Sequence, residues 1–574
     1  MFSSTAQALP VSTDSKRRIY LLEKRFKRIL RSNRKIIWIV IIVLCLNFIY
    51  SLRSMEPNVV FDLGDEYAGT YKEKYLKTIK SPDEIDDEFY YKVQLMGLLD
   101  DLVNEPIESS HFNNSKNPME IIKSRYGNPE DFNKLSYKQQ AEIYVKEIIP
   151  QSEYKFKPIQ DTVYKDIYYP KKYVKDRVNR WKKITNVLTS AELEAYEIND
   201  DLFKQSLLET KNAKSEYNER SANEIFNALT HLKFFAKYFF KPDPAPEGET
   251  NAQANSEETD ALCKTASQSL FTWLSGYYPT FTKYNRRLEP SVVRHFDPNE
   301  NCMITNLQSS LTGRGIVITA SDGQVPELAG LLATLRLLNT QIPIQIVHND
   351  DLSLMSIKSL IEVALNPVFR LPKSQSNFKA PSKIPHTLDL TFVDVSKTIS
   401  FRYKNYFQRW GMKLLAYLFN SFEEMILLDT DTVPLIPIEE YFNLPAYQQT
   451  HTLFFRDREA NSFLYDGVMD FFIKSLPNED DYKYLQIRST PAEILNNRFF
   501  GEKARHFMEA GLFAINKKEK FDGVVAAVVM QFFKLISSSV HGEKEFVWLG
   551  QEFMGDSYKF NSHPAISIGE LTQP

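Results

Sequence analysis

The chain has 574 residues, of which 43% are hydrophobic and 25% charged, with only 19 Gly and 28 Pro. This composition excludes a collagen, a low-complexity disordered chain and a disulfide-rich miniprotein, and the length predicts two to four domains with at least one large core. The formal net charge of −3 is unevenly distributed, because Met1–Lys35 holds 10 Lys and Arg against 2 Asp and Glu. The acidic remainder argues against a nucleic-acid-binding protein, which needs basic surface to neutralise phosphates.

An apolar segment follows this basic tail. Residues 36–52 (IIWIVIIVLCLNFIYSL) carry no formal charge and are closed by Arg53. As a helix they span roughly 26 Å, a little less than a ~30 Å hydrocarbon core. No small-residue cleavage site follows, so we expect an uncleaved signal anchor rather than a signal peptide or a buried core helix. The Lys and Arg excess on its N-terminal side predicts a cytosolic tail, 1–35, and a lumenal body.

Two features of the body bear on a secretory location. Asn113 begins the only Asn-x-Ser/Thr sequon of the chain and is a candidate glycosylation site. Of the three cysteines, Cys45 lies in the apolar segment, so only Cys263 and Cys302 reach the lumen. In an oxidising compartment these two could pair, but free buried thiols are equally compatible with the sequence.

The first part of the body, 53–306, is predicted to be a helical stem or accessory region. From Pro57 to about Phe240 it is rich in Tyr, Lys and Glu and poor in Gly, with helical spacing over 222–240. The stretch 241–260 (KPDPAPEGETNAQANSEETD) has no aliphatic residue larger than Ala, so it cannot bury a core. We therefore expect it to be a flexible loop, the simplest case being a plain surface insertion.

From about Leu307 the pattern changes to alternating strands and helices. Gly315–Ala320 (GIVITA) predicts a buried strand, 327–338 a helix with five Leu on one face, and 344–348 a second strand. Strand, helix and strand in this order form a βαβ unit, so 307–574 is predicted to be an α/β domain with a parallel-rich sheet. Its ligand site is expected at the carboxyl ends of the strands. Further strands are predicted at 425–428, 453–455 and 512–515.

The run Met425–Leu435 (MILLDTDTVPL) carries the clearest chemical signal. Four apolar strand residues end in Asp429-Thr430-Asp431, and alternate residues of an extended chain point the same way. Asp429 and Asp431 can therefore meet one divalent cation, and hard carboxylate oxygens suit Mg²⁺ or Mn²⁺. A solvated turn is the alternative. A P-loop NTPase is disfavoured because no G-x-x-x-x-G-K-[ST] occurs.

The longer run Lys413–Leu435 (KLLAYLFNSFEEMILLDTDTVPL) resembles the core of the fungal Golgi α-1,3-mannosyltransferases, type II membrane enzymes that cap outer-chain N-glycan mannan and O-linked mannose chains. The resemblance extends from Thr312 to the C-terminus. It implies a GT-A-like nucleotide-sugar-binding α/β fold, a GDP-mannose donor and a divalent metal, usually Mn²⁺. The other blocks that carry it are GIVITA, FFRDR from Phe454, EAGLFAINK from Glu509 and HGEKEFVWLG from His541.

The resemblance also suggests roles for individual residues. Arg456 and Arg458 would hold diphosphate oxygens, and Asp457 would orient a sugar hydroxyl or steady an arginine; a surface ion-pair cluster is the alternative. Glu509 would contact acceptor hydroxyls and Gly511 would let the backbone approach the donor, unless both belong to a structural turn. The family often has Ser where this chain has Ala510, which puts a hydroxyl contact there in doubt.

Three more residues come from the matched blocks. Lys413 is taken as a substrate-binding residue. His541 would complete the metal shell, or would be an ordinary surface histidine. Trp548 would pack on a sugar face or fill the core, and the core is slightly favoured.

The expected function is transfer of mannose from GDP-mannose to a terminal mannose of N-linked outer chains or O-linked chains, with retention, in the Golgi membrane. A double displacement would need a carboxylate nucleophile, for which Asp457 and Glu509 are candidates, whereas front-side attack needs none. The alternatives are an α-1,2 linkage, a metal-dependent lumenal hydrolase, and a non-catalytic scaffold of a Golgi mannosyltransferase complex. The sequence leaves the acceptor, the linkage and the oligomeric state open.

Overall fold

The computed structural model describes residues 115–158, 200–241, 252–296, 302–366, 387–458, 462–464 and 466–566, without the side chains of 200–217, 252–256 and 466. All of these residues belong to one compact unit, 105–574. The predicted cytosolic tail 1–35, the predicted anchor 36–52 and Asn113 lie outside them. Among the helices that are described, none combines the length and the apolar character that crossing a membrane requires.

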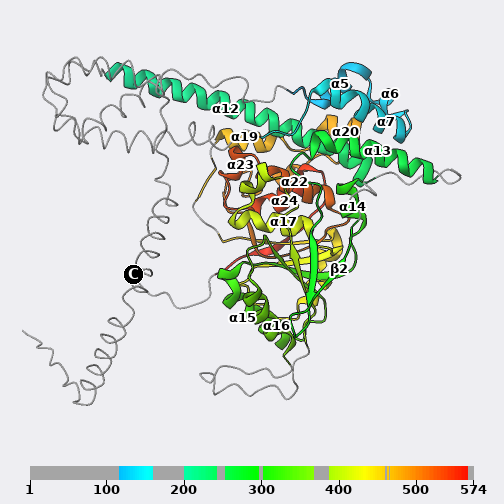
Figure 1. The fold of residues 1–574 in the computed structure, drawn as a ribbon. Coiled ribbons are helices and arrows are strands. Elements are labelled where there is room, and N and C mark those ends of the chain that lie inside the picture. Colours follow the sequence, from blue (N-terminus) through cyan, green and yellow to red (C-terminus); the bar gives the residue numbers. More distant parts are fainter. Residues whose placement is uncertain are drawn as a thin grey trace, which may run out of the picture. The chain divides into compact units, whose positions relative to one another are not determined.

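A nine-stranded mixed sheet forms the centre of the C-terminal part (Figure 1), in the order β2-β1-β5-β4-β3-β6-β8-β7-β9. Strands β5, β4, β3 and β6 are parallel neighbours, and β8 pairs antiparallel with both β6 and β7. The sheet confirms the α/β prediction. The strands are β1 Thr280–Tyr284, β2 Pro290–Arg294, β3 Arg314–Thr319, β4 Ile344–His348, β5 Leu390–Asp394, β6 Glu424–Leu428, β7 Thr452–Arg456, β8 Met508–Asn516 and β9 Phe560–Pro564.

The predicted βαβ unit is present. Strand β3, helix α15 (Val325–Leu337) and strand β4 follow one another, and Ile316 pairs with Ile344 in parallel register. The strands predicted at 425–428, 453–455 and 512–515 are β6, β7 and the second half of β8. They were recognisable because all or most of their residues are buried and apolar, which is typical of strands covered on both faces.

Helices cover both faces of this sheet (Figure 1). Helices α15 and α16 (Leu354–Leu365) bury Ile316, Ile344 and Ile426, whereas α17 (Met412–Phe419), α22 (Phe521–Gln531) and α24 (Lys544–Phe553) bury the alternate residues on the opposite face. Helices α22 and α24 approach very closely: a Cβ on Gly550 would lie 2.2 Å from the carbonyl oxygen of Gly523. Only glycine therefore fits at Gly550.

Further helices, most of them short, lie between the strands of this part of the chain. They are η5 Asp322–Gln324, η7 Phe401–Phe407, η8 Arg409–Gly411, η9 Ile438–Asn443, α18 Pro445–Thr450, α19 Asp466–Lys474, α20 Glu479–Leu485, α21 Ala492–Leu495 and α23 Lys534–Ser537.

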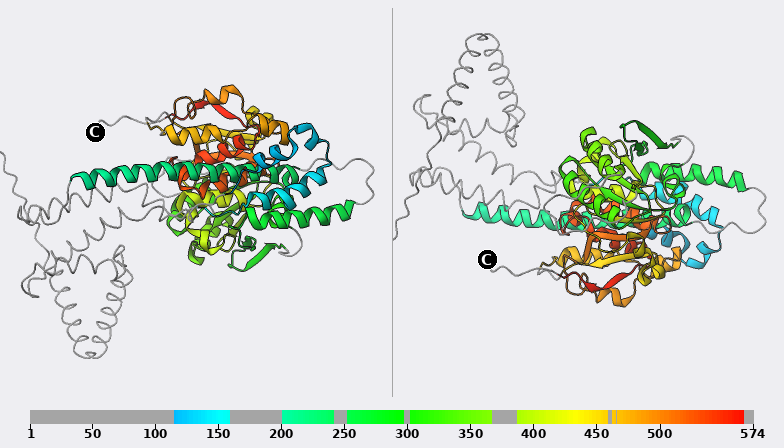
Figure 2. Two further views of the ribbon diagram at one scale, coloured as in Figure 1. Left: turned by 90° about the horizontal axis from the view of Figure 1, so that it is seen from above. Right: turned by 90° about the horizontal axis from the view of Figure 1, so that it is seen from below.

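The predicted boundary at 306/307 does not separate two structural units. Strand β1 pairs antiparallel with β5 and so belongs to the sheet. The long helix α12 (Asp200–Phe235) runs alongside α22 (Figure 2), and Lys233 forms a buried 2.7 Å ion pair with Asp481 of α20. The helical elements share one hydrophobic core with α17, α22 and α24. The other helices are α5 Pro118–Tyr126, α6 Pro129–Asn133, α7 Tyr137–Ile143, η3 Tyr144–Ile148, α8 Ile149–Ser152, η4 Ala236–Phe240, α13 Ala252–Leu270 and α14 Met303–Ser309.

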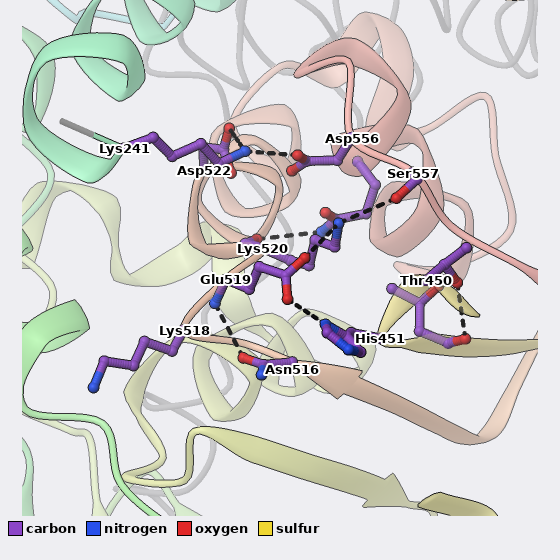
Figure 3. Close-up of polar contacts among 12 residues, drawn as sticks. Lys241, Thr450, His451, Asn516, Lys518, Glu519, Lys520, Asp522, Asp556 and Ser557 are labelled. Carbon is purple, nitrogen blue, oxygen red and sulfur yellow. Dashed lines mark hydrogen bonds and ion pairs between the residues drawn. The ribbon is translucent and has the colours of Figure 1, made fainter. Parts of the chain in front are cut away.

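Ion pairs fasten the end of η4 to the C-terminal region (Figure 3). The ammonium of Lys241 lies 2.8 Å from Asp522 Oδ2 and 2.6 Å from Asp556 Oδ1, and Lys520 donates to Ser557 Oγ at 3.3 Å. Burial, with the neighbouring Asp522 charge, raises the pKa of Asp556 to about 7. The helical region and the α/β region thus share charges as well as a core.

The predicted loop 241–260 is wrong over its last part. Helix α13 begins at Ala252 and includes an Asp260–Lys264 pair at 2.9 Å, one turn apart on the helix. Ala, Gln and Glu favour helix here although the segment holds no large aliphatic residue. The pairing of the lumenal cysteines, left open by the sequence, is present: a disulfide joins Cys263 of α13 to Cys302, which caps α14.

Candidate functional site

Asp429 and Asp431 lie where the sequence predicted, directly after β6 at the carboxyl ends of the parallel strands. The four strand residues before them are fully buried. The Asp429 amide donates to the Gly511 carbonyl at 2.9 Å, and the Thr432 hydroxyl donates to the same oxygen at 2.8 Å. The turn is therefore fixed to the neighbouring strand β8, which holds Asp429 half-buried and leaves Asp431 exposed.

A lysine lies between two carboxylates at this edge. The Lys413 ammonium, in the first turn of α17, is 2.6 Å from Asp429 Oδ1, 2.7 Å from Asp429 Oδ2 and 3.1 Å from Glu543 Oε1. Burial opposes the charge of Lys413, but Glu543 and Asp429 outweigh it, so the lysine pKa is raised. Lys413 is therefore a cation at the pH of any cellular compartment.

Two carboxylates contact Lys413, and the charges of two more, Asp431 and Glu509, act on Asp429. Burial raises the pKa of Asp429, Lys413 lowers it, and the charges of Asp431 and Glu509 raise it further. Burial likewise raises the pKa of Glu543, against the effect of Lys413. One ammonium thus balances an edge that carries more negative than positive charge, and additional positive charge would be stabilised there.

Glu509 and Gly511 lie on β8 beside this edge. Glu509 Oε1 accepts from the Gly511 amide at 2.9 Å, and a Cβ on Gly511 would lie 3.3 Å from that oxygen and 3.4 Å from Thr432 Oγ1. Gly511 is therefore closely packed against the Asp429 turn, and a larger residue there would displace the Glu509 carboxylate slightly. Ala510 is buried, so its side chain faces away from solvent.

Asp457, directly after β7, is the centre of a second charged cluster. Its side chain is 1% exposed, and Lys544 donates to its Oδ2. The Arg458 amide donates to Oδ1 at 2.7 Å, and His506 Nδ1 lies 3.5 Å from Oδ2. Burial would raise the pKa of Asp457, but Lys544 outweighs it and the pKa is lowered. Asp457 is thus an ionised anchor for cations.

The two arginines of this block differ from Asp457 in exposure. Arg456 is the exposed last residue of β7, and the Arg458 side chain is 69% exposed with its guanidinium 3.6 Å from Asp457. Both can reach a ligand in solvent.

His541 lies beside this second cluster. Its ring centroid is 4.7 Å from that of His506 and 5.2 Å from that of Trp410. Burial and the nearby Lys544 and Arg505 charges lower its pKa. The next residue, Gly542, has a φ of +69°, a left-handed conformation that turns the chain between His541 and Glu543. The contacts of His541 place it with the Asp457 cluster, and no contact joins it to Asp429 or Asp431 in the described part of the chain.

The described ranges contain no group of three or more His, Cys, Asp or Glu side chains arranged to hold a metal ion. The chemistry of the Asp429–Asp431 edge nevertheless suits one, because hard oxygens meet there and repel one another. Lys413 contacts both oxygens of Asp429, so Asp431 is the more accessible ligand.

All of these residues lie within one region of similarity to known proteins. Residues 313–574 match the family described as "Mannosyltransferase putative". This match covers a little under half of the chain and defines what is called below the mannosyltransferase segment.

The chain is also similar to individual proteins named as mannosyltransferases. The chain is 33% identical over 307 residues to "Putative alpha-1,3-mannosyltransferase MNN14" of Candida albicans, covering 53% of this chain and 42% of the relative. It is 29% identical over 378 residues to alpha-1,3-mannosyltransferase MNT2 of Saccharomyces cerevisiae, covering 61% and 64%. The chain thus spans only 42% and 64% of the length of these two relatives. The solved mannosyltransferase Ktr4p of S. cerevisiae in complex with GDP is 10% identical, covering 59% of this chain and 84% of that one, with a TM-score of 0.24, which does not establish a shared fold.

Within this mannosyltransferase segment, Trp548 lies apart from the site. Its side chain is wholly buried, its indole N–H donates to Glu545 Oε2 at 2.6 Å, and Phe499 and Phe507 pack against it. Burial raises the pKa of Glu545 to about 7. Trp548 therefore fills the core, the favoured of its two predicted positions.

The sequence reasoning missed four site residues of the mannosyltransferase segment. Glu543 and Lys544 stand in the recognised block HGEKEFVWLG, yet only its His and Trp were considered. The charged run Glu543–Glu545 directly after Gly542, in a matched block, was the available signal. His506 and Trp410 had none, because only the fold brings them beside His541.

Proposed function

We propose that the chain is a retaining, metal-dependent α-1,3-mannosyltransferase that transfers mannose from GDP-mannose to a terminal mannose of N-linked outer chains or O-linked chains. The observation that carries the proposal is the Lys413 ammonium held between Asp429 and Glu543 at the end of β6. The match of 313–574 to a mannosyltransferase family and the α-1,3 linkage in the relatives' names support the choice of reaction.

The chemistry requires stabilisation of a departing diphosphate. Negative charge develops on GDP as its bond to mannose breaks, and fixed cations stabilise that charge without reorganising. Lys413, held by two carboxylates, and the exposed Arg458, steadied by Asp457, are the cations that the chain supplies. Arg456 is close enough in sequence to assist.

The exposed Asp431, together with the half-buried Asp429, would hold a divalent metal, most simply Mn²⁺. Bound there, the metal would neutralise diphosphate oxygens and orient the donor. Burial raises the pKa of Asp429, and repulsion from Asp431 and Glu509 raises it further; such an ion would relieve that repulsion.

The burial of the two candidate nucleophiles favours front-side attack. Asp457 is 1% exposed and paired with Lys544, so it is not available to an anomeric carbon. Glu509 is half-buried and accepts from the Gly511 amide, which suits a hydrogen-bonding role toward the acceptor. Front-side attack retains the configuration without a covalent intermediate. The donor phosphate takes the acceptor proton, so no protein base is needed.

The proposal extends to location. An apolar segment at 36–52 behind a basic tail would anchor the chain in the Golgi membrane as a single-pass type II protein with residues 53–574 lumenal. Association with a Golgi mannosyltransferase complex is compatible with this location.

Incubation of the full-length chain with GDP-mannose and α-mannobiose tests the function, with and without EDTA, followed by linkage analysis of the product. An α-1,3-linked trisaccharide made only with GDP-mannose and lost in EDTA is expected. An α-1,2 linkage would correct the specificity. Mannose released without GDP-mannose would indicate a hydrolase. No transfer by the folded chain would favour a non-catalytic scaffold.

A further inference from the structure

We propose that Trp410 and His541 together form the binding surface for the acceptor mannoside. The inference rests on the proposed function and deepens it by naming where the second substrate lies.

Trp410 is unusual in its exposure. Its side chain is 54% exposed, whereas Trp273 and Trp548, the other two described tryptophans, are fully buried. Exposing a large aromatic ring to water is unfavourable in free energy, and such rings are common on ligand-binding surfaces.

The segment that carries Trp410 is rigid. Arg409 has a φ of +53°, a strained value for a residue with a side chain. A Cβ on Gly411 would lie 3.1 Å from the Tyr406 carbonyl oxygen, and Gln531 of α22 donates to that oxygen at 2.8 Å. These contacts hold the backbone on both sides of Trp410, which reduces the entropic cost of binding on its ring.

The indole is backed by the turn at 541–542. Atoms of its ring lie 3.5 Å from the position of a Cβ on Gly542, and the His541 ring is tilted against it by 43° with centroids 5.2 Å apart. Because this turn covers only part of the ring, more than half of Trp410 still faces solvent beside an exposed imidazole.

The Trp410–His541 surface lies next to the edge that holds Asp429, Lys413 and Glu543. Trp410 and Lys413 are three residues apart, about one helical turn, and His541 and Glu543 are two apart. The two segments touch twice, first through Trp410 and His541 and then through Lys413 and Glu543, whose charges are 3.1 Å apart. A ligand on Trp410 would therefore lie next to Asp429.

The chemistry of this surface suits a pyranose. The C–H face of a mannose ring packs on an indole, and an imidazole can donate to one hydroxyl and accept from another. A nucleotide base also stacks on tryptophan, but the position argues against it. His541 contacts the cluster after β7, to which the proposed function assigns the donor diphosphate. The guanine base is expected on the other side of β6, at β3, β4 and β5, where a parallel sheet binds nucleotides.

The test compares Trp410→Ala, Trp410→Phe and His541→Ala with Tyr482→Ala, which removes an equally exposed aromatic ring from α20. Steady-state transfer by the full-length chain gives separate KM values for α-mannobiose and GDP-mannose. We expect Trp410→Ala to raise the α-mannobiose KM about tenfold and to leave the GDP-mannose KM within about twofold. Trp410→Phe should fall between, and Tyr482→Ala should match the wild type.

Calorimetric titration with α-mannobiose, without donor, separates this inference from the proposed function. Loss of mannobiose binding in Trp410→Ala supports the surface even if the chain transfers no mannose from GDP-mannose. Unchanged mannobiose binding and KM in Trp410→Ala, or a raised GDP-mannose KM alone, would overturn it, the latter by identifying a base-stacking residue.

Discussion

Replacement of Lys413 by Met removes the one ammonium that contacts both Asp429 and Glu543 and keeps most of the side-chain volume. Both carboxylates then face each other without a counter-charge. Glu543 is buried, and Asp429 is 25% exposed, so neither is fully solvated.

The magnitude follows from burial. Breaking a fully buried ion pair costs about 3–5 kcal/mol, because the remaining charge keeps its desolvation penalty. Lys413 is 15% exposed and the carboxylates can take up protons as their pKa values rise further, so we expect the free energy of unfolding to fall by about 2–3 kcal/mol. The loss should be smaller at pH 5 than at pH 8, since protonation of the carboxylates removes the repulsion.

Guanidinium denaturation of the full-length chain measures this loss, with the double variant Lys413→Met/Glu543→Gln as its control. Removal of the Glu543 charge should restore much of the stability but none of the transfer activity, because the diphosphate still lacks its cation. Equal stability of Lys413→Met and the wild type at pH 8 would refute the electrostatic account of this edge.

Three further predictions concern other charged groups. Lys233→Met leaves the buried Asp481 uncompensated and should lower the denaturation midpoint by the equivalent of about 3–5 kcal/mol; an unchanged midpoint would contradict a shared core. Burial raises the pKa of Glu545 from 4.5 to about 7, so Glu545 ionises at a lower pH in the unfolded state than in the folded state, and the free energy of unfolding should decrease as the pH rises from about 4.5 to about 7. Thermal melts of Glu545→Gln over this pH range should show a smaller decrease. Asp457→Asn frees Lys544 and Arg458 and should raise the GDP-mannose KM about tenfold, with steady-state kinetics as the check.

The strands that the sequence revealed are the buried ones. Strands β3 and β6 contain continuous apolar runs, β4 has three apolar residues of five, and the repeated leucines of α15 lie on one face, so their pattern alone identifies them. Strand β2 has no buried residue and β9 is the polar segment FNSHP, so neither has an apolar pattern to recognise. Their pairing comes from neighbouring strands.

The union of the helical and α/β regions was also beyond the sequence. Lys233 and Asp481 are 248 residues apart, and nothing local indicates that they pair. Periodicity identifies an amphipathic helix such as α12 but does not say what it packs against. The predicted stem therefore looked separate.

The site was half predictable for the same reason. A carboxylate pair after a buried strand is a local signal, and it placed Asp429 and Asp431 correctly at the end of β6. The partners of Asp429 are tertiary: Lys413 precedes it by 16 residues and Glu543 follows it by more than a hundred. The positions of Trp548 and His541 depend on burial and on neighbours distant in sequence, which only the fold determines.

Mannosyl transfer by Asp431→Asn and Asp429→Asn, compared with the wild-type chain at saturating GDP-mannose and α-mannobiose, tests the central claim most directly. We predict an α-1,3-linked product from the wild type and a loss of roughly hundredfold or more in kcat in each folded variant, because the charge that organises the leaving diphosphate is removed. Wild-type rates in both variants, or no product from the folded wild-type chain, would contradict the claim.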